Sequence, residues 1–222
     1  MIETKTAVVV VVAGLGLLTA AFLFQDKMVR ESSSLVLQIP FSSQAPNNNW
    51  ENNEDCEETS IIMANAFLSG NTDNVLAATS TQEAIDNLKK WEQENLGYNA
   101  DTGADATARI AMEVYGLKIT KINNFTEQDL KDELLKQHPI LLPVNAKLLD
   151  TPKYRDVAPF YHMIVVRGYN EKVKGFIVND PGTEDGNGNE YSFEILQNAA
   201  TGWNHDLMRM EPDQKVALVV SK

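Results

Sequence analysis

The chain has 222 residues, of which 43% are hydrophobic and 23% charged, as in a globular protein rather than a disordered or wholly membrane-embedded one. Its formal net charge is −12, and because no basic stripe occurs along it, a nucleic-acid partner is disfavoured. The single cysteine, Cys56, excludes an internal disulfide. One cysteine and three histidines are also a poor set for structural zinc, so we expect no metal and no cofactor.

The first element in chain order is an apolar segment near the N-terminus. After a short flank at 1–6, residues 7–24 are 18 consecutive uncharged residues, which predicts a membrane anchor. A cleaved signal peptide is the alternative, although the apolar run continues past the small residues at 19–21. Either interpretation predicts that the rest of the chain lies outside the cytoplasm. The flanking charges orient the segment only weakly.

A polar linker at 25–34 is expected to lead into one domain at 35–222. Its apolar periodicity and turn residues predict helices at 56–68, 80–94, 105–115, 127–137 and 193–199, and strands at 35–39, 117–122, 140–144, 161–168, 175–180 and 216–220. Thr126 is a predicted N-cap, and Gly70 and Gly116 are predicted C-caps. Because most helices precede most strands, the sequence predicts an α+β domain rather than a doubly wound one.

Cys56 opens the helix predicted at 56–68. Unpaired backbone N–H groups and the helix dipole favour a thiolate at a helix N-terminus. Acidic residues at 54, 55, 57 and 58 oppose this effect, because they disfavour a further negative charge. Taken alone, these features favour an ordinary half-buried cysteine over a nucleophile.

Two downstream strands bring a histidine and an aspartate within reach of each other. If these strands form a regular hairpin in which Gly168 pairs with Lys174, His162 lies directly opposite Asp180 on an otherwise apolar face. Such a carboxylate fixes the orientation of the imidazole and leaves its other nitrogen to take a proton from a thiol. The alternative is a simple cross-strand ion pair. A register slip of one residue would separate the two side chains.

A thiolate that attacks a carbonyl also needs donors for the developing oxyanion. Gln44 is a candidate, because it lies in an Asn- and Pro-rich loop upstream of the predicted helix. The backbone N–H of Cys56 would be the second donor.

Four short motifs, in this order, resemble a known family: PFSSQAP at 40–46, DCEETS at 55–60, YHMIVVRGY at 161–169 and NDPGT at 179–183. They are similar to motifs in stand-alone bacterial relatives of the bacteriocin-processing (double-glycine leader) peptidases, which are papain-like cysteine peptidases. The resemblance implies a papain-like fold, with N-terminal helices packed on a C-terminal antiparallel sheet.

The same resemblance implies a role for each of four residues. Cys56 would be the nucleophile, His162 the base, Asp180 the orienting acid and Gln44 the oxyanion donor. One departure is that many relatives have glycine directly after the cysteine, where this chain has Glu57.

We therefore interpret the chain as a membrane-anchored, extracytoplasmic cysteine peptidase acting through a Cys-His-Asp triad and an acyl-enzyme. The expected partners are a peptide or protein substrate and a membrane, bound through residues 7–24. A cell-wall peptide amidase is the first alternative. A catalytically silent papain-like binding module is the second, favoured by the acidic surroundings of Cys56.

A further acidic stretch at 184–190 is compatible with calcium binding only at first sight. Counted from Asp185 as an EF-hand loop, the sixth position is Glu190, where the motif requires glycine. The stretch is therefore predicted to be a flexible surface loop.

Overall fold

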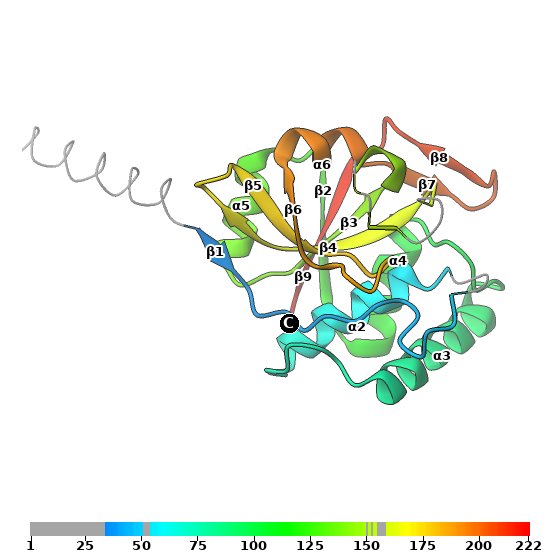
Figure 1. Cartoon of the computed structure of the whole chain (residues 1–222). Coiled ribbons are helices and arrows are strands. Elements are labelled where there is room, and N and C mark those ends of the chain that lie inside the picture. Colours follow the sequence, from blue (N-terminus) through cyan, green and yellow to red (C-terminus); the bar gives the residue numbers. More distant parts are fainter. Residues whose placement is uncertain (1–33, 51–53, 150, 152, 155–158) are drawn as a thin grey trace, which may run out of the picture. The chain divides into compact units, whose positions relative to one another are not determined.

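A seven-stranded antiparallel sheet organises the chain from Leu35 onward (Figure 1). Its strands are β1 (Leu35–Val36), β2 (Lys118–Asn123), β3 (Ile140–Val144), β4 (His162–Asn170), β5 (Gly175–Asn179), β6 (Asn187–Ser192) and β9 (Val216–Ser221). The spatial order is β2-β9-β3-β4-β5-β6, and β1 pairs with β4. A separate two-stranded sheet joins β7 (Gly202–Asn204) to β8 (Arg209–Glu211).

The computed structural model describes residues 34–50, 54–149, 151, 153–154 and 159–222. The flank expected at 1–6, the anchor or signal segment expected at 7–24 and nearly all of the linker expected at 25–34 lie outside the described residues. Within the described ranges, no helix has the length and apolar character needed to cross a membrane.

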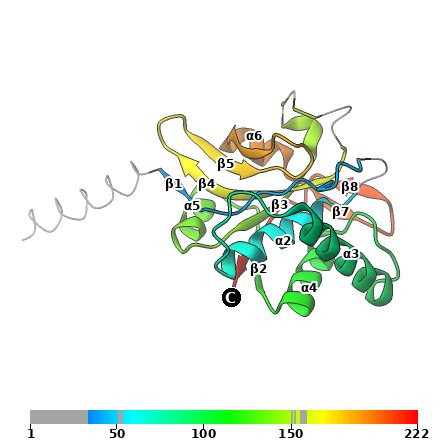
Figure 2. The same cartoon turned by 60° about the horizontal axis from the view of Figure 1, so that its bottom comes forward.

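The helices lie on both sides of the sheet. They are α2 (Cys56–Leu68), α3 (Ala78–Asn95), α4 (Ala104–Tyr115), α5 (Glu127–Leu135) and α6 (Phe193–Ala199), with a 3₁₀ turn η1 (Ala146–Leu148). Figure 2 shows α2, α3 and α4 gathered on one side of the sheet and α6 on the opposite side. The α+β prediction is confirmed: helices dominate the first half of the domain and antiparallel strands the second.

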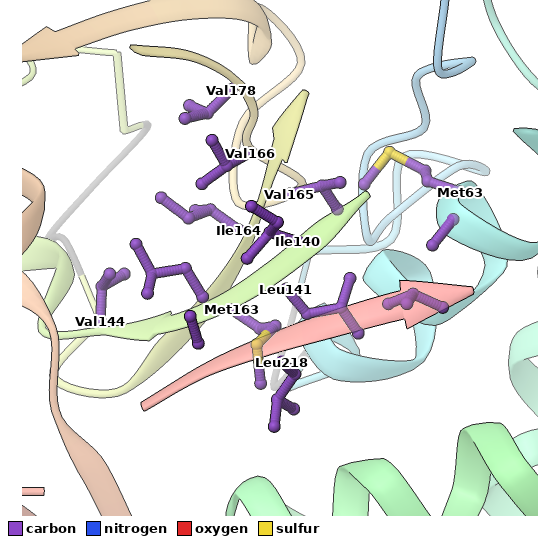
Figure 3. Close-up of a cluster of buried hydrophobic side chains, with 14 of the residues drawn as sticks. Met63, Ile140, Leu141, Val144, Met163, Ile164, Val165, Val166, Val178 and Leu218 are labelled. Atoms are coloured by element: carbon purple, nitrogen blue, oxygen red, sulfur yellow. The ribbon is translucent and has the colours of Figure 1, made fainter. Parts of the chain in front are cut away.

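Strand β3 is apolar throughout and β4 is apolar from Met163 to Val166, because both faces of the sheet are covered here. All five residues of β3 and the first five of β4 are buried. Figure 3 shows their side chains packed with Leu218 of β9 and Met63 of α2. Full burial of each such aliphatic side chain contributes about 1.5–3 kcal/mol to folding. This core fixes α2 against β4, the arrangement on which the candidate site depends.

The predicted caps agree with the structure where local chemistry is strong. Thr126 forms a capping box with Asp129, and Gly116 ends α4 with a left-handed φ of 66°. Helix α5 is shorter than predicted, because it ends at Leu135 and Gln137 has a positive φ of 65°.

Some elements differ from the sequence predictions. The strand expected at 35–39 is regular only at Leu35–Val36, and η1, β6, β7 and β8 were not expected. The prediction of a flexible loop at 184–190 is wrong for its second half, because Asn187–Ser192 forms β6. This edge strand is rich in Asn and has no apolar alternation to reveal it, because main-chain pairing with β5 holds it in place.

Candidate active site

Helix α2 carries its first residue, Cys56, to one end of β4. The helix packs on that strand, and Ser60 Oγ donates a hydrogen bond of 3.3 Å to the carbonyl of Met163. The side chain of Cys56 is buried, with 3% of the residue exposed. As the first residue of a helix, Cys56 has a backbone N–H without a partner inside the helix, so this N–H can donate to a ligand.

His162 begins β4 beside the helix and is also buried. Its Nε2 atom lies 2.7 Å from Oδ1 of Asp180, a fully buried carboxylate that directly follows β5. A nitrogen that bonds a carboxylate is the N–H donor. In the neutral ring the other nitrogen, Nδ1, is therefore the acceptor. The ring is thus arranged to take a proton through Nδ1.

The hairpin register predicted from the sequence is wrong, although the predicted contact exists. Val165 pairs with Asn179, a bulge follows between Val166 and Gly168, and the strands close over residues 171–174. Asp180 therefore continues toward Ile164 rather than His162. Because this shift from the predicted pairing is two residues, His162 and Asp180 keep the same face and meet diagonally. The bulge was not foreseen because nothing in the alternation of the two strands marks it.

The carboxylate of Asp180 accepts three hydrogen bonds. Oδ1 accepts from His162 and from the backbone N–H of Gly182 at 2.9 Å, and Oδ2 accepts from the hydroxyl of Tyr154 at 2.9 Å. Burial alone would raise the pKa of Asp180, but His162, Tyr154 and the Gly182 N–H together outweigh it and lower that pKa. Asp180 is therefore an ionised acceptor at neutral pH.

The turn after Asp180 depends on two glycines. A Cβ atom on Gly182 would lie 2.8 Å from Cε1 of His162 and 2.9 Å from a ring carbon of Tyr154. A Cβ atom on Gly186 would lie only 1.8 Å from the carbonyl oxygen of Asp180, whose N–H donates to the carbonyl of Gly186 at 2.9 Å. Because neither glycine has a side chain, the turn can lie this close to the imidazole of His162 and to the backbone of Asp180.

Gln44, Cys56 and His162 line one pocket of about 330 Å³. Its other lining residues are Glu54, Asp101, Pro159, Phe160, Tyr161, Trp203 and Met208. The loop that carries Gln44 is tied to the turn after Asp180, because its backbone N–H donates to the carbonyl of Pro181 at 2.8 Å. The structure thus brings together all four residues singled out from the sequence, with Asp180 behind His162.

The thiol of Cys56 has a close acidic neighbour. Its Sγ atom donates a hydrogen bond to Oε2 of Glu57 at 2.9 Å. Burial raises the pKa of Cys56 well above its usual value, and Glu57 and Asp101 raise it further. The expectation that the helix N-terminus favours a thiolate is therefore opposed by stronger effects, and Cys56 is a protonated thiol at neutral pH.

Cys56, Glu57 and Asp101 are the described residues whose ligand atoms, one from each, lie within 4.8 Å of one another. A thiol and two carboxyl groups are possible metal ligands, but a metal would have to displace the proton of Cys56. Both oxygens of Glu57 already accept hydrogen bonds, from Cys56 and from the backbone of Thr102. The chemistry of this set gives no reason to assign a metal to it.

Three contributors to the site escaped sequence reasoning. Tyr154 lies in a stretch without apolar periodicity, so nothing pointed to its contact with Asp180. Gly182 belongs to the Asp-Pro-Gly turn, and that motif was the signal that could have identified its packing against His162. Asp101 lies in the loop before α4, far from the other motifs in the sequence.

Comparisons with known proteins identify a family and a shared fold. A family model described as the Peptidase_C39 like family matches residues 36–206, a range that contains Gln44, Cys56, His162 and Asp180. Among solved structures, the chain is similar to one described as a C39-like peptidase from Bacillus anthracis. The TM-score is 0.56 and the identity 14%, over 86% of this chain and 98% of that one. At this identity the likeness establishes a shared fold. No curated protein matches the chain.

Proposed function

The chain belongs to the Peptidase_C39-like family, and from this we propose that it is a cysteine peptidase whose nucleophile is Cys56. The observation that carries this proposal is the pocket shared by Gln44, Cys56 and His162, with Asp180 bonded to the far nitrogen of the imidazole. A thiol, a base and an oriented carboxylate are the groups that acyl transfer through sulfur requires.

The reaction begins when His162 Nδ1 takes the proton of Cys56 and the sulfur attacks the carbonyl carbon of a peptide bond. Asp180 stabilises the resulting imidazolium through Nε2. The side-chain amide of Gln44 and the backbone N–H of Cys56 donate to the oxyanion. Collapse of this intermediate breaks the C–N bond, and the imidazolium protonates the leaving amine. Water, activated by His162, then hydrolyses the thioester and regenerates the thiol.

The proposed substrate is a peptide or protein segment lying across the pocket. Phe160 and Met208 line that pocket and are 63% and 62% exposed, so they offer apolar surface to a substrate side chain. We also propose that the enzyme acts outside the cytoplasm. The support for this location is the uncharged segment at 7–24.

The test is the pH dependence of Cys56 alkylation by iodoacetamide, from about pH 5 to about pH 10, in the full chain and in its His162→Ala variant. Because the chain has a single cysteine, the signal reports that residue alone. We expect the variant to react more slowly over the neutral range, since it lacks the proton acceptor. His138→Ala is the matched control, because His138 bonds Glu133 on another part of the domain, and its profile should equal that of the parent.

Identical profiles in the parent and the His162→Ala variant would contradict the catalytic proposal. They would favour the second candidate, a silent binding module with the same fold. The observation that favours this candidate is the hydrogen bond from Cys56 to Glu57, since it holds the sulfur in its unreactive, protonated form.

A further inference from the structure

Glu57 is held rigidly against the sulfur. It is the second residue of α2 and only 1% exposed, and its two oxygens have different partners. Oε1 accepts from the backbone N–H of Thr102 at 2.8 Å, and Oε2 accepts from Cys56. Thr102 is itself anchored, because its carbonyl accepts from the hydroxyl of Tyr161 at 2.9 Å. The carboxylate therefore cannot swing away from the thiol without breaking a buried hydrogen bond.

This geometry assigns the proton of the Cys56–Glu57 pair to sulfur. Both oxygens of Glu57 accept hydrogen bonds, so the S–H group is the donor. Burial raises the pKa of Glu57 well above its usual value, and the hydrogen bonds from Cys56 and Thr102 act in the opposite direction by favouring the carboxylate. With these two donors in place, loss of the thiol proton would put a thiolate against a buried carboxylate. A hydrogen bond to the neutral form of an acid, and a negative charge beside it, both disfavour its ionisation.

Other titratable groups surround the sulfur. The charges of Asp101, in the loop before α4, and of Glu58, on the same helix as Cys56, both raise the pKa of the thiol. His162 lies across the pocket on β4, and Tyr154 and Tyr161 also interact with Cys56. Of these described groups, Glu57 is the one that forms a hydrogen bond with Sγ, so it has the most direct control over the thiol proton.

We propose that Glu57 is a positioning residue that keeps Cys56 in its protonated form at rest and thereby restrains the nucleophile. This inference rests on the proposed function, because restraint has meaning only if His162 is the competing acceptor. In this proposal two groups compete for the thiol proton. Glu57 retains it in the resting site, and His162 receives it during the reaction.

Replacement of Glu57 by glutamine separates charge from shape. The glutamine side chain keeps an oxygen for the N–H of Thr102 and turns a donor instead of an acceptor toward the sulfur. Burial of Cys56 is unchanged, while the negative charge and the acceptor are lost. The variant should therefore favour the thiolate without loss of packing.

The experiment compares alkylation of Cys56 across pH in the full chain, Glu57→Gln, His162→Ala and the double variant. We expect Glu57→Gln to lower the midpoint of reactivity by at least ~1 pH unit, which is about a tenfold gain in thiolate at neutral pH. Glu58→Gln is the matched control, because it removes the neighbouring buried charge without touching Sγ, and we expect a clearly smaller shift.

Four outcomes decide between the ideas. An unchanged or raised midpoint in Glu57→Gln, with reactivity still dependent on His162, overturns this inference and leaves the proposed function standing. An equal shift in Glu58→Gln also overturns it, because the effect would then be general charge. A lowered midpoint that does not depend on His162 supports the restraint by Glu57 and overturns the catalytic proposal. A lowered midpoint that does depend on His162 supports both.

If the Glu57→Gln variant does not fold, a second measurement on the parent chain tests the same inference. The ultraviolet absorbance of the thiolate in the parent chain, titrated with alkali, reports the Cys56 midpoint directly. A midpoint at or below the ordinary thiol value of about 8.5 would overturn the restraint, because a thiol that Glu57 keeps protonated must titrate above that value.

Discussion

Three hydrogen bonds converge on one buried carboxylate, and they decide how His162 is held. Oδ1 of Asp180 accepts from the imidazole and from the N–H of Gly182, and Oδ2 accepts from Tyr154, so both carboxylate oxygens are hydrogen-bonded. The ring of Tyr154 also packs edge-on against His162, with 6.0 Å between ring centroids. Orientation of the base thus depends on groups that do not touch the thiol.

Replacement of Tyr154 by phenylalanine should raise the pKa of Asp180 while it keeps the aromatic contact with His162. Loss of a hydrogen bond to a buried charge costs about 1.5–3 kcal/mol of stability. Because the pKa of Asp180 is lowered in the folded protein, this stability is present near neutral pH and is lost as pH falls through that pKa. In thermal denaturation, the variant should therefore melt below the parent protein at neutral pH but not at an acidic pH below the pKa of Asp180. A lowering of the melting temperature by the same amount at both pH values would contradict this prediction.

Replacement of Gly182 by alanine should displace the imidazole, since the added Cβ would lie 2.8 Å from Cε1 of His162. We expect the His162-dependent part of Cys56 alkylation to fall about tenfold or more, because small misplacements of catalytic groups are costly. Gly175→Ala is the matched control, as its Cβ would meet the nearest atom at an ordinary 3.4 Å. Unchanged alkylation in a folded Gly182→Ala variant would show that the turn is adaptable.

At the scale of elements, α2 and α3 meet through buried acids as well as apolar side chains. Asp55, which precedes α2, forms an ion pair of 2.5 Å with Lys89 of α3. Glu58 of α2 and Glu92 of α3 are both buried and interact with each other. Burial raises the pKa of Glu92 to about 7, and the charges of Glu57 and Asp55 raise it too, against the lowering effects of Glu58 and Lys89.

A raised carboxyl pKa makes the helix contact sensitive to pH. Between the ordinary Glu value of about 4.3 and about 7, folded Glu92 keeps a proton that the unfolded chain releases, so stability falls as pH rises through this window. Glu92→Gln removes the charge. It should therefore raise the melting temperature at pH 8 by several degrees, at about 2–4 °C per kcal/mol, and much less at pH 5.

The control for this prediction is Glu94→Gln on the same helix, because the side chain of Glu94 is 62% exposed. Its melting temperature should follow that of the parent at both pH values. If Glu92→Gln destabilises the protein equally at pH 5 and pH 8, the carboxyl is an ordinary hydrogen-bonding group and the pH argument fails.

At the scale of the whole molecule, the residues from Leu35 to Lys222 form one compact unit. The last strand, β9, lies between β2 and β3, and β1 pairs with β4, so both ends of this unit are built into the sheet. The first and last strands of the unit are therefore both held by main-chain hydrogen bonds to other strands of the same sheet.

We expect a fragment of residues 35–222 to melt at the temperature of the full chain and to show the same alkylation profile of Cys56. Sedimentation with membranes should differ, because only the full chain carries the apolar segment at 7–24. A full chain that remains in the supernatant as the fragment does would argue against an uncleaved anchor. A fragment that fails to fold would place the domain boundary elsewhere.

Sequence alone was sufficient for the features that depend on local order along the chain. Apolar periodicity and caps predicted most of the helices and central strands, and the α+β class followed from their order. Four short motifs were enough to single out Gln44, Cys56, His162 and Asp180 and to indicate the family. Their catalytic roles stay predictions until the alkylation experiment is done.

Tertiary structure alone decided what depends on packing between distant segments. The turn at 171–174 and the bulge after Val166 together set a register that alternation could not reveal, because a shift of two residues leaves the same side chains on the same face. The tertiary structure also places Tyr154 against Asp180, and it places Glu57 and the loop at 101–102 beside the thiol. Burial then raised the pKa of Cys56, an effect that depends on what surrounds the sulfur in space and not on its neighbours in sequence alone.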